Sequence, residues 1–343
     1  MLHDFEFDEL LNVNNYYIKK LIAKSPFSNV FLAFDKNAKK EIIIKLFEIP
    51  KDRTESFIQT VRTLKILNLS GVCKIYNFAK IYNKKEISSY FNINLNENND
   101  INYIIVTEEL MINGNIESIM KEYLQNDGKC QSIMNPTIRS KIIFGVAMIM
   151  KVLHSNNFLH QNLTAYHILL NDKYEPKISF SCFSNFLKEN YQINHSILQS
   201  PFYMAPEIIL KREFSFSIDV YSYSILLYRM FSNNFKFSDG FALNRYNFLN
   251  RISEGERLKK HQNIPNVFWE LIQKCWCQEP DKRPTFCDIV NELKNDKFAL
   301  DEFGMKTDLN ELHNYQQQLF KEEIDYIPEK FSLSMSCLIN ENH

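Results

Sequence analysis

The 343-residue sequence is poor in glycine, and this scarcity bears on one kind of ligand site. It has seven glycines, and none of them precedes Gly71. That is about 2% of the chain, against the ~7% of an average protein. Glycine has no Cβ, so it lets a backbone come close to a phosphate group. The first 70 residues therefore contain no glycine-rich phosphate-binding loop.

Three further absences narrow the class of protein. The seven cysteines are scattered and form no C-x-x-C pair, which predicts free thiols in a reducing compartment. The net charge of −1 gives no overall attraction for a polyanion, so we do not expect a nucleic-acid partner. The acidic start, MLHDFEFDEL, argues against a signal peptide, and the most apolar run, at 142–150, is too short to cross a membrane. We expect a cytoplasmic protein without a membrane partner.

The N-terminal third has the pattern of a small sheet with one helix. Residues 17–47 contain three apolar runs separated by short polar breaks, as in an antiparallel meander. Residues 54–67 then place apolar side chains at helical spacing. Two more strand patterns, at 72–82 and 101–110, flank a polar segment that we interpret as a surface loop. The sequence predicts five antiparallel strands and one helix here.

From about residue 115 the hydrophobic periodicity is mainly helical. Residues 135–155 begin with an asparagine cap and a proline and continue as an apolar helix. Beyond residue 296 we expect one or two appended helices and a weakly ordered tail. The fold class predicted is α+β, with a small sheet lobe and a large helical lobe. Three more helical patterns lie at 218–231, 267–276 and 285–295.

Four motifs resemble those of protein kinases. LHQNLTAYHILL (159–170) keeps the frame of the catalytic loop H-R-D-L-x-x-x-x-N, and MAPE (204–207) resembles the end of an activation segment. DVYSYSILLYRM (219–230) and CWCQEPDKRPTFCDIV (275–290) are similar to two motifs of the large lobe. Over residues 17–295 the chain therefore resembles the protein kinase superfamily, in its tyrosine-kinase-like group.

The resemblance implies an organisation and a set of structural contacts. It divides the chain into an N-terminal extension (1–16), a small lobe (17–108), a large lobe (109–295) and a C-terminal helical extension with a tail (296–343). It implies that Glu207 pairs with Arg283, and that Asp219 accepts hydrogen bonds from the backbone of the loop at His160. Loss of either partner of a buried ion pair should destabilise the fold.

The positions that hold ATP in the family depart from its pattern. The V-A-I-K strand becomes IIIK (42–45), so Lys45 is kept, but the glutamate expected on the next helix is replaced by Thr60. Glu55 lies about 140° away around that helix and is a poor substitute. The would-be glycine-rich loop, AKSPFSN (23–29), contains no glycine. The sequence therefore offers Lys45 no obvious carboxylate partner.

The positions that perform the chemistry depart further. Asn162 stands where the family has its catalytic base, and His167 where it has a metal-binding asparagine. Phe180 stands where the metal-binding aspartate of D-F-G would be. We therefore predict no intact catalytic residue and no magnesium site. An alternative zinc site of His160, His167 and Cys182 would suit zinc by residue type only, since the spacing is that of the motifs.

The sequence predicts at most a weak nucleotide-binding site. Thr107 corresponds to the gatekeeper and Glu108 to Leu110 to the hinge between lobes, so with Lys45 they are the candidate nucleotide-binding residues. Ile43 replaces the smaller alanine that touches adenine in the family. It is expected to fill the adenine slot, so we expect no cofactor.

These residues lead to one functional hypothesis and two alternatives. The hypothesis is a catalytically inactive kinase-like domain, a pseudokinase and not an enzyme. It would act as an allosteric or scaffolding partner in signal transduction, bound to a protein such as an active kinase. The first alternative is a divergent but active Ser/Thr or Tyr protein kinase. The second is a nucleotide sensor that binds ATP without metal.

Overall fold

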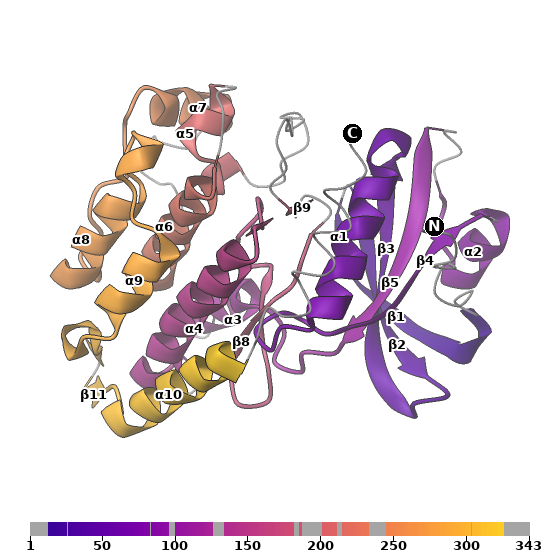
Figure 1. The fold of residues 1–343 in the computed structure, drawn as a ribbon, viewed down its shortest axis with the longest axis horizontal. Coiled ribbons are helices and arrows are strands. Elements are labelled where there is room, and N and C mark those ends of the chain that lie inside the picture. The colour runs from indigo at the N-terminus through magenta and orange to yellow at the C-terminus, as the bar shows by residue number, and fades with distance from the viewer. Residues whose placement is uncertain are drawn as a thin grey trace.

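Five antiparallel strands near the N-terminus form one sheet in the order β1-β2-β3-β5-β4, in the computed structural model of the chain. The structure describes residues 13–25, 27–82, 84–95, 100–125, 134–181, 185–186, 201–210, 215–232, 245–302 and 304–325. This sheet makes up most of one lobe, and the helices make up the other (Figure 1). The strands are β1 (Tyr16–Ser25), β2 (Ser28–Asp35), β3 (Lys40–Pro50), β4 (Ile75–Ile81) and β5 (Ile101–Glu109).

The sheet buries side chains on both faces because strand residues alternate in direction. On one face, Phe47 packs against Phe57 of helix α1 (Thr54–Leu67), with ring centroids 5.0 Å apart. On the other face, Phe31 packs against Phe91 of helix α2 (Lys84–Phe91) at 4.7 Å. The sequence pattern predicts α1 but not α2. An eight-residue helix has too few turns to give a convincing periodic pattern, although its buried Ile87 and Phe91 do lie four residues apart.

The second lobe is built around the long helix α4 (Pro136–Ser155). Its first turn is capped by Asn135, whose side chain accepts a hydrogen bond from the backbone N–H of Ile138, as the sequence predicts. No helix among the described residues has the length and apolarity to cross a membrane. The other helices of this lobe are α3 (Ile116–Gln125), α5 (Pro206–Ile209), α6 (Ser217–Phe231), α7 (Arg245–Ser253), α8 (Asn266–Cys275) and α9 (Phe286–Leu293).

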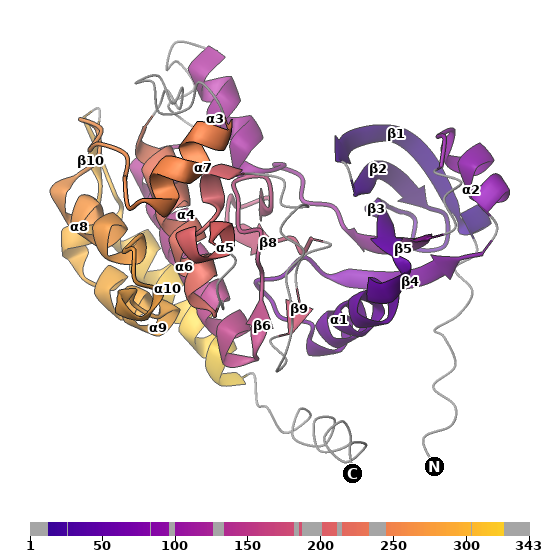
Figure 2. The ribbon, with the colours of Figure 1, turned by 90° about the horizontal axis from the view of Figure 1, so that it is seen from above.

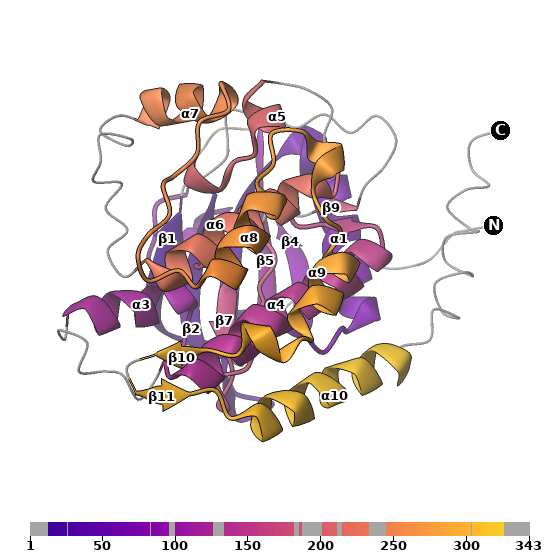
Figure 3. The same cartoon turned by 90° about the vertical axis from the view of Figure 1, so that its left-hand side faces the viewer.

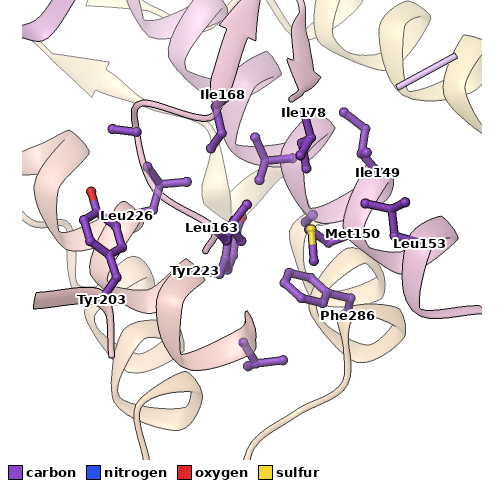
Figure 4. Close-up of a cluster of buried hydrophobic side chains, with 14 of the residues drawn as sticks. Ile149, Met150, Leu153, Leu163, Ile168, Ile178, Tyr203, Tyr223, Leu226 and Phe286 are labelled. Atoms are coloured by element: carbon purple, nitrogen blue, oxygen red, sulfur yellow. The ribbon is translucent and has the colours of Figure 1, made fainter. Parts of the chain in front are cut away.

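One continuous hydrophobic core joins α4 to α6 and α9 and to the loops between them. Figure 4 shows Met150 and Leu153 of α4 facing Phe286 of α9; Leu163 of the loop and Tyr223 of α6 belong to the same cluster. The Tyr223 hydroxyl donates to the backbone oxygen of Ile143, so its polar group is satisfied inside the core. This packing fixes the segment at 159–167 on a rigid base.

Four short strands lie within residues 158–186, and single 3-10 turns occur elsewhere in the chain. Strands β7 and β8 form a hairpin, and β6 pairs with β9. Their bounds are β6 (Phe158–Leu159), β7 (Ile168–Leu170), β8 (Pro176–Ile178) and β9 (Asn185–Phe186). Single 3-10 turns lie at Val13–Asn15, Lys51–Arg53, Pro201–Tyr203, Pro280–Lys282 and Asp296–Phe298.

The C-terminal extension packs along the helical lobe. A hairpin of β10 (Asp301–Glu302) and β11 (Met305–Lys306) leads into helix α10 (Leu309–Asp325), which runs beside α4 (Figure 3). Near its end, Glu323 pairs with Lys151 of α4 at 2.8 Å. Glu322 accepts a hydrogen bond from Ser70, in the loop between α1 and β4, at 2.6 Å. Helix α10 therefore contacts both lobes.

The two-lobed α+β fold expected from the sequence is confirmed. Figure 2 shows the sheet lobe and the helical lobe side by side, with the hinge segment between β5 and α3 joining them. The domain division given above stays a prediction. Most of the N-terminal extension and the tail after Asp325 lie outside the described residues.

Candidate functional site

Lys45 lies where the two lobes meet. It is on β3, where its register partners are Val30 of β2 and Val106 of β5. Its ammonium group donates to the hydroxyl of Ser179, in the segment after β8, and its side chain is only 10% exposed. A weaker contact reaches the backbone oxygen of Phe180 at 3.5 Å. A buried ammonium is costly unless it is paired, so its partners decide its role.

The main partner of Lys45 is Glu108. The Nζ atom lies 2.9 Å from Oε2 of Glu108, whose side chain is 1% exposed. Burial raises the pKa of the Glu108 carboxyl, and the charge of Lys45 opposes that rise. The prediction that Lys45 has no carboxylate partner was wrong. The carboxylate comes from strand β5 instead of from helix α1.

Helix α1 places no carboxylate at the family position. Thr60 is buried, and its hydroxyl donates to the backbone oxygen of Ser56 in the previous turn. Glu55 is exposed on the outside of the helix. Thr60 therefore fills space on the buried face of α1.

The predicted gatekeeper is displaced by one residue. Thr107 pairs with Ile44 in the register, and its hydroxyl exchanges hydrogen bonds with the backbone of Asn77 in β4. It therefore points to the face of the sheet away from Lys45. Glu108 pairs with Ile43 and points to the face that carries Lys45. The cause is the strict alternation of a strand, in which a shift of one residue reverses the face.

Glu109, the residue after Glu108, stabilises the hinge after β5. Glu109 accepts hydrogen bonds from the backbone N–H of Lys74 at 2.7 Å and from the ammonium of Lys177 in β8 at 2.6 Å. Leu110 follows directly and is partly exposed. The hinge residues therefore connect the sheet to the helical lobe.

The loop that follows β6 is held from below by Asp219. Its two carboxylate oxygens accept the backbone N–H groups of His160 and Gln161, each at 2.8 Å. Asp219 is fully buried at the start of α6, and it also contacts the ring of His154 at 3.0 Å. The predicted role of Asp219 is confirmed. Gln161 has a positive φ of 62°, a conformation that costs energy and that these bonds stabilise.

Asn162 and His167 lie on this loop and form hydrogen bonds with His160 and Thr164, respectively. The backbone N–H of Asn162 donates to Nδ1 of His160 at 3.3 Å, and Nδ1 of His167 lies 3.1 Å from the hydroxyl of Thr164. The surrounding protein removes water from His167 and lowers its pKa well below 6.5, and the nearby charge of Lys45 lowers it as well. Burial also lowers the pKa of His160. Both rings are therefore neutral at pH 7.

Phe180 belongs to an aromatic cluster that spans the lobes. Its ring centroid lies 5.6 Å from that of Phe47 and 6.2 Å from that of Phe57, and the Lys45 ammonium lies 5.0 Å from its ring. The ring is 2% exposed. It fills with hydrocarbon the place where the family has a metal-binding carboxylate.

The usual magnesium site does not fit these residues. Hard cations such as Mg²⁺ bind through oxygen ligands, most often carboxylates. Asn162, His167 and Phe180 supply one amide, one imidazole and one hydrocarbon ring. In the part of the chain that the structure describes, no three His, Cys, Asp or Glu side chains are placed to hold a metal ion. Cys182, which the zinc alternative requires, lies outside the described residues.

The fold and the loop held by Asp219 define a protein-kinase-like domain, and comparison with known proteins gives the family. The profile of the family described as "Protein tyrosine and serine/threonine kinase" matches residues 17–293. The match covers well over half of the sequence, so the chain belongs to this family. The superfamily indicated by the sequence motifs is thus confirmed.

Three relatives are examples of the similar proteins. The chain is 31% identical over 157 residues to "RGS domain-containing serine/threonine-protein kinase A" of Dictyostelium discoideum, covering 46% of this chain and 14% of the relative. It is 27% identical over 210 residues to "Ephrin type-A receptor 5" of Rattus norvegicus, covering 60% and 20%. It is 30% identical over 187 residues to "Tyrosine-protein kinase FRK" of Homo sapiens, covering 53% and 35%. The alignments span only a minor part of each relative.

These comparisons contradict the expectation that the chain is not an enzyme. The matching family is one of kinases, and two of the three relatives are named as kinases. Unusual residues at Thr60, Asn162, His167 and Phe180 do not by themselves exclude phosphoryl transfer. The reaction depends mainly on positioning and on electrostatic stabilisation, with little covalent work for the protein. The non-enzyme prediction gave single positions too much weight.

Proposed function

We propose that the chain is a divergent protein kinase domain that transfers the γ-phosphoryl group of ATP to a hydroxyl group of a protein. The observation that carries the proposal is the buried pair of Lys45 and Glu108 at the junction of the lobes. A charged lysine kept at this place, in a chain of the kinase family, is suited to hold phosphate oxygens. The protein partner expected from the sequence is then the substrate.

Lys45 has a donor to offer to ATP. An ammonium group carries three N–H donors. One is directed at Glu108 and one at Ser179, while the contact to the backbone oxygen of Phe180 is long at 3.5 Å. A phosphate oxygen can replace this last contact and form a stronger, charge-assisted hydrogen bond. The proposal therefore leaves the pair with Glu108 intact when ATP binds.

The loop at 160–167 positions the hydroxyl group that accepts the phosphoryl group. Asp219 holds its backbone, and the amide of Asn162 can hydrogen-bond the attacking hydroxyl without removing its proton. The bond from the acceptor oxygen to the γ-phosphorus forms as the bond to the β–γ bridging oxygen breaks, and ADP leaves. In a loose transition state the hydroxyl keeps its proton until late, so a phosphoryl oxygen can take it.

The proposed reaction is expected to be slow. A positioned general base contributes roughly 10²–10⁴ in rate, and an amide cannot supply it. The relatives include kinases named for serine/threonine and for tyrosine, so both kinds of acceptor belong in the assay. No step of the proposal uses a metal held by Asn162, His167 or Phe180.

The test is a phosphoryl-transfer assay with γ-labelled ATP. The purified full chain is incubated with peptides containing serine, threonine or tyrosine, with Mg²⁺, with Mn²⁺ and with a chelator. We expect labelled peptide or labelled protein, and its loss in Lys45→Met. Lys51→Met, which removes an exposed lysine just after β3, is the matched control and should keep the activity.

Two results would overturn the proposal. The first is labelling no greater than that of Lys45→Met under every condition. The second is that ATP stabilises the protein against heat, that Lys45→Met abolishes this effect, and that no phosphoryl group is transferred. A ligand that binds the folded state raises its stability, so this result would show binding alone. The second result would favour the metal-independent nucleotide sensor. Absence of both effects would support the apolar filling of the adenine slot by Ile43.

A further inference from the structure

The partners Lys45 and Glu108 belong to neighbouring strands of one sheet. Strands β3 and β5 run antiparallel, with Lys45 opposite Val106 and Ile43 opposite Glu108. Lys45 and Glu108 therefore point to the same face and stand diagonally across the pair of strands. Long side chains on such diagonal positions can reach each other. The ion pair is thus built from backbone geometry that is fixed by the hydrogen bonds of the sheet.

Helix α1 offers no carboxylate that competes for Lys45. The sole acidic residue within Thr54–Leu67 is Glu55, which is exposed. Thr60 directs its hydroxyl to its own helix backbone. The described polar contacts of Lys45 consequently come from the two strands and from Ser179 and Phe180. Helix α1 adds apolar packing of Phe57 against Phe47 and Phe180.

One oxygen of the Glu108 carboxylate accepts no hydrogen bond within the described part of the chain. Oε2 contacts Lys45, while Oε1 is buried and has no hydrogen-bond partner within the described part of the chain. A buried carboxylate oxygen without a donor is unfavourable, and most such atoms in folded proteins are paired. Packing alone does not explain a carboxyl group at this buried position. The interaction with Lys45 explains it.

We infer that Glu108 is the positioning residue for Lys45, in place of the α1 carboxylate used elsewhere in the family. This inference rests on the proposed function, because it assigns Glu108 a part in holding ATP. Its consequence is that Lys45 stays aligned whatever the position of α1. In this chain a movement of α1 therefore does not switch the phosphate-binding lysine on or off.

The experiment removes the charge of two glutamates of the sheet, one at a time. It then adds a carboxylate on α1 to the variant that lacks the charge of Glu108. Glu108→Gln keeps the shape and removes the charge. Glu48→Gln does the same for a half-buried glutamate of β3, whose register partner Tyr103 belongs to the opposite face, and is the matched control. The measurement is kcat and KM for ATP in the assay above, with the Kd of ATP as a second readout. Thermal unfolding of each variant shows that it is folded.

We expect Glu108→Gln to raise the KM or Kd for ATP by about tenfold or more, with Glu48→Gln within about twofold of the wild type. The double variant Glu108→Gln with Thr60→Glu returns a carboxylate to the α1 position. It should recover a large part of the lost affinity. A purely structural role of Glu108 would not be rescued by a charge on another element.

Three results separate this inference from the proposed function. Transfer by the wild type that is unchanged in Glu108→Gln overturns this inference alone. A loss that the double variant does not recover also overturns it, since Glu108 would then be structural. A wild type that neither transfers phosphate nor binds ATP overturns both. If Glu108→Gln does not fold, Glu108→Asp replaces it in the test. This variant withdraws the carboxylate by one methylene and should raise the KM for ATP. An unchanged KM overturns the inference.

Discussion

Arg283 and Glu207 form a buried, two-pronged ion pair. Nη1 and Nη2 of the arginine donate to Oε1 and Oε2 of the glutamate at 2.7 and 2.8 Å. The arginine also donates to the backbone oxygens of Ser217 and Cys277. Three separate segments of the large lobe therefore meet at one guanidinium group. The pairing expected from the MAPE and DKRP motifs is confirmed.

Arg283→Gln should lower the free energy of unfolding by about 3–5 kcal/mol, because it leaves the buried Glu207 carboxylate without its partner. Urea denaturation is the measurement. Lys274→Gln breaks the exposed pair with Glu292 and should change the stability by about 0–1 kcal/mol. Equal losses in the two variants would show that burial of the Arg283 pair does not set its energy.

Phe180→Ala should lower the free energy of unfolding by about 3–5 kcal/mol, because it opens a cavity between Phe47 and Phe57. Phe180→Leu keeps most of the volume and should lose clearly less. Thermal unfolding of the two variants compares them directly. Similar stability of Phe180→Ala and the wild type would mean that the aromatic cluster does not join the lobes in solution.

The neutral histidines predict that the protein loses stability in weak acid. Burial lowers the pKa of His160 and of His167 below the ordinary 6.5, so the folded state binds fewer protons than the unfolded chain. The stability they contribute is complete above pH 6.5 and is lost as the pH falls below it. The slope is at most about 1.4 kcal/mol per pH unit for each histidine.

Urea denaturation between about pH 7.5 and about pH 5.5 measures this slope. His160→Gln and His167→Gln should each make it shallower than in the wild type. The comparison with variants is necessary because the raised pKa of Glu108 acts in the opposite sense. Identical slopes in the wild type and both variants would contradict the prediction.

Gly145→Ala should weaken the attachment of the C-terminal helix. A Cβ atom at this position of α4 would lie 2.3 Å from the Tyr315 hydroxyl and 2.6 Å from Cγ of Pro176. Such overpacking costs about 1–3 kcal/mol, which thermal unfolding would detect. Adding Tyr315→Phe removes one of the two clashes and should restore part of the stability. A double variant no more stable than Gly145→Ala would place the strain at Pro176.

The sequence predicted those features that follow from local pattern and spacing. The periodicity at 54–67 coincides with the bounds of α1, and the cap at Asn135 begins α4 as expected. The roles of Asp219 and Glu207 were implied by the resemblance of their motifs, in matching order, to those of protein kinases. In each case the information lies within a short segment or in the order of several segments.

The partner of Lys45 could not be predicted in this way. It depends on the register between β3 and β5, which sets Glu108 and not Thr107 on the face of Lys45. An irregularity between Ile75 and Asn77 also shifts the pairing of β4 with β5. Registers between strands sixty residues apart leave no local mark in a sequence, although two adjacent glutamates at the end of a buried strand were a signal to weigh.

The contacts of α10 determine where a stable fragment of this protein can end. A fragment that ends with the family match at residue 293 lacks Tyr315, Glu311 and Glu323. It would then expose the surface of α4 beside Gly145 and leave Lys141 and Lys151 without those carboxylates. During synthesis the same surface stays open until α10 has left the ribosome. The smallest unit that can fold with α4 covered on this side is therefore longer than the family's own boundary and includes α10.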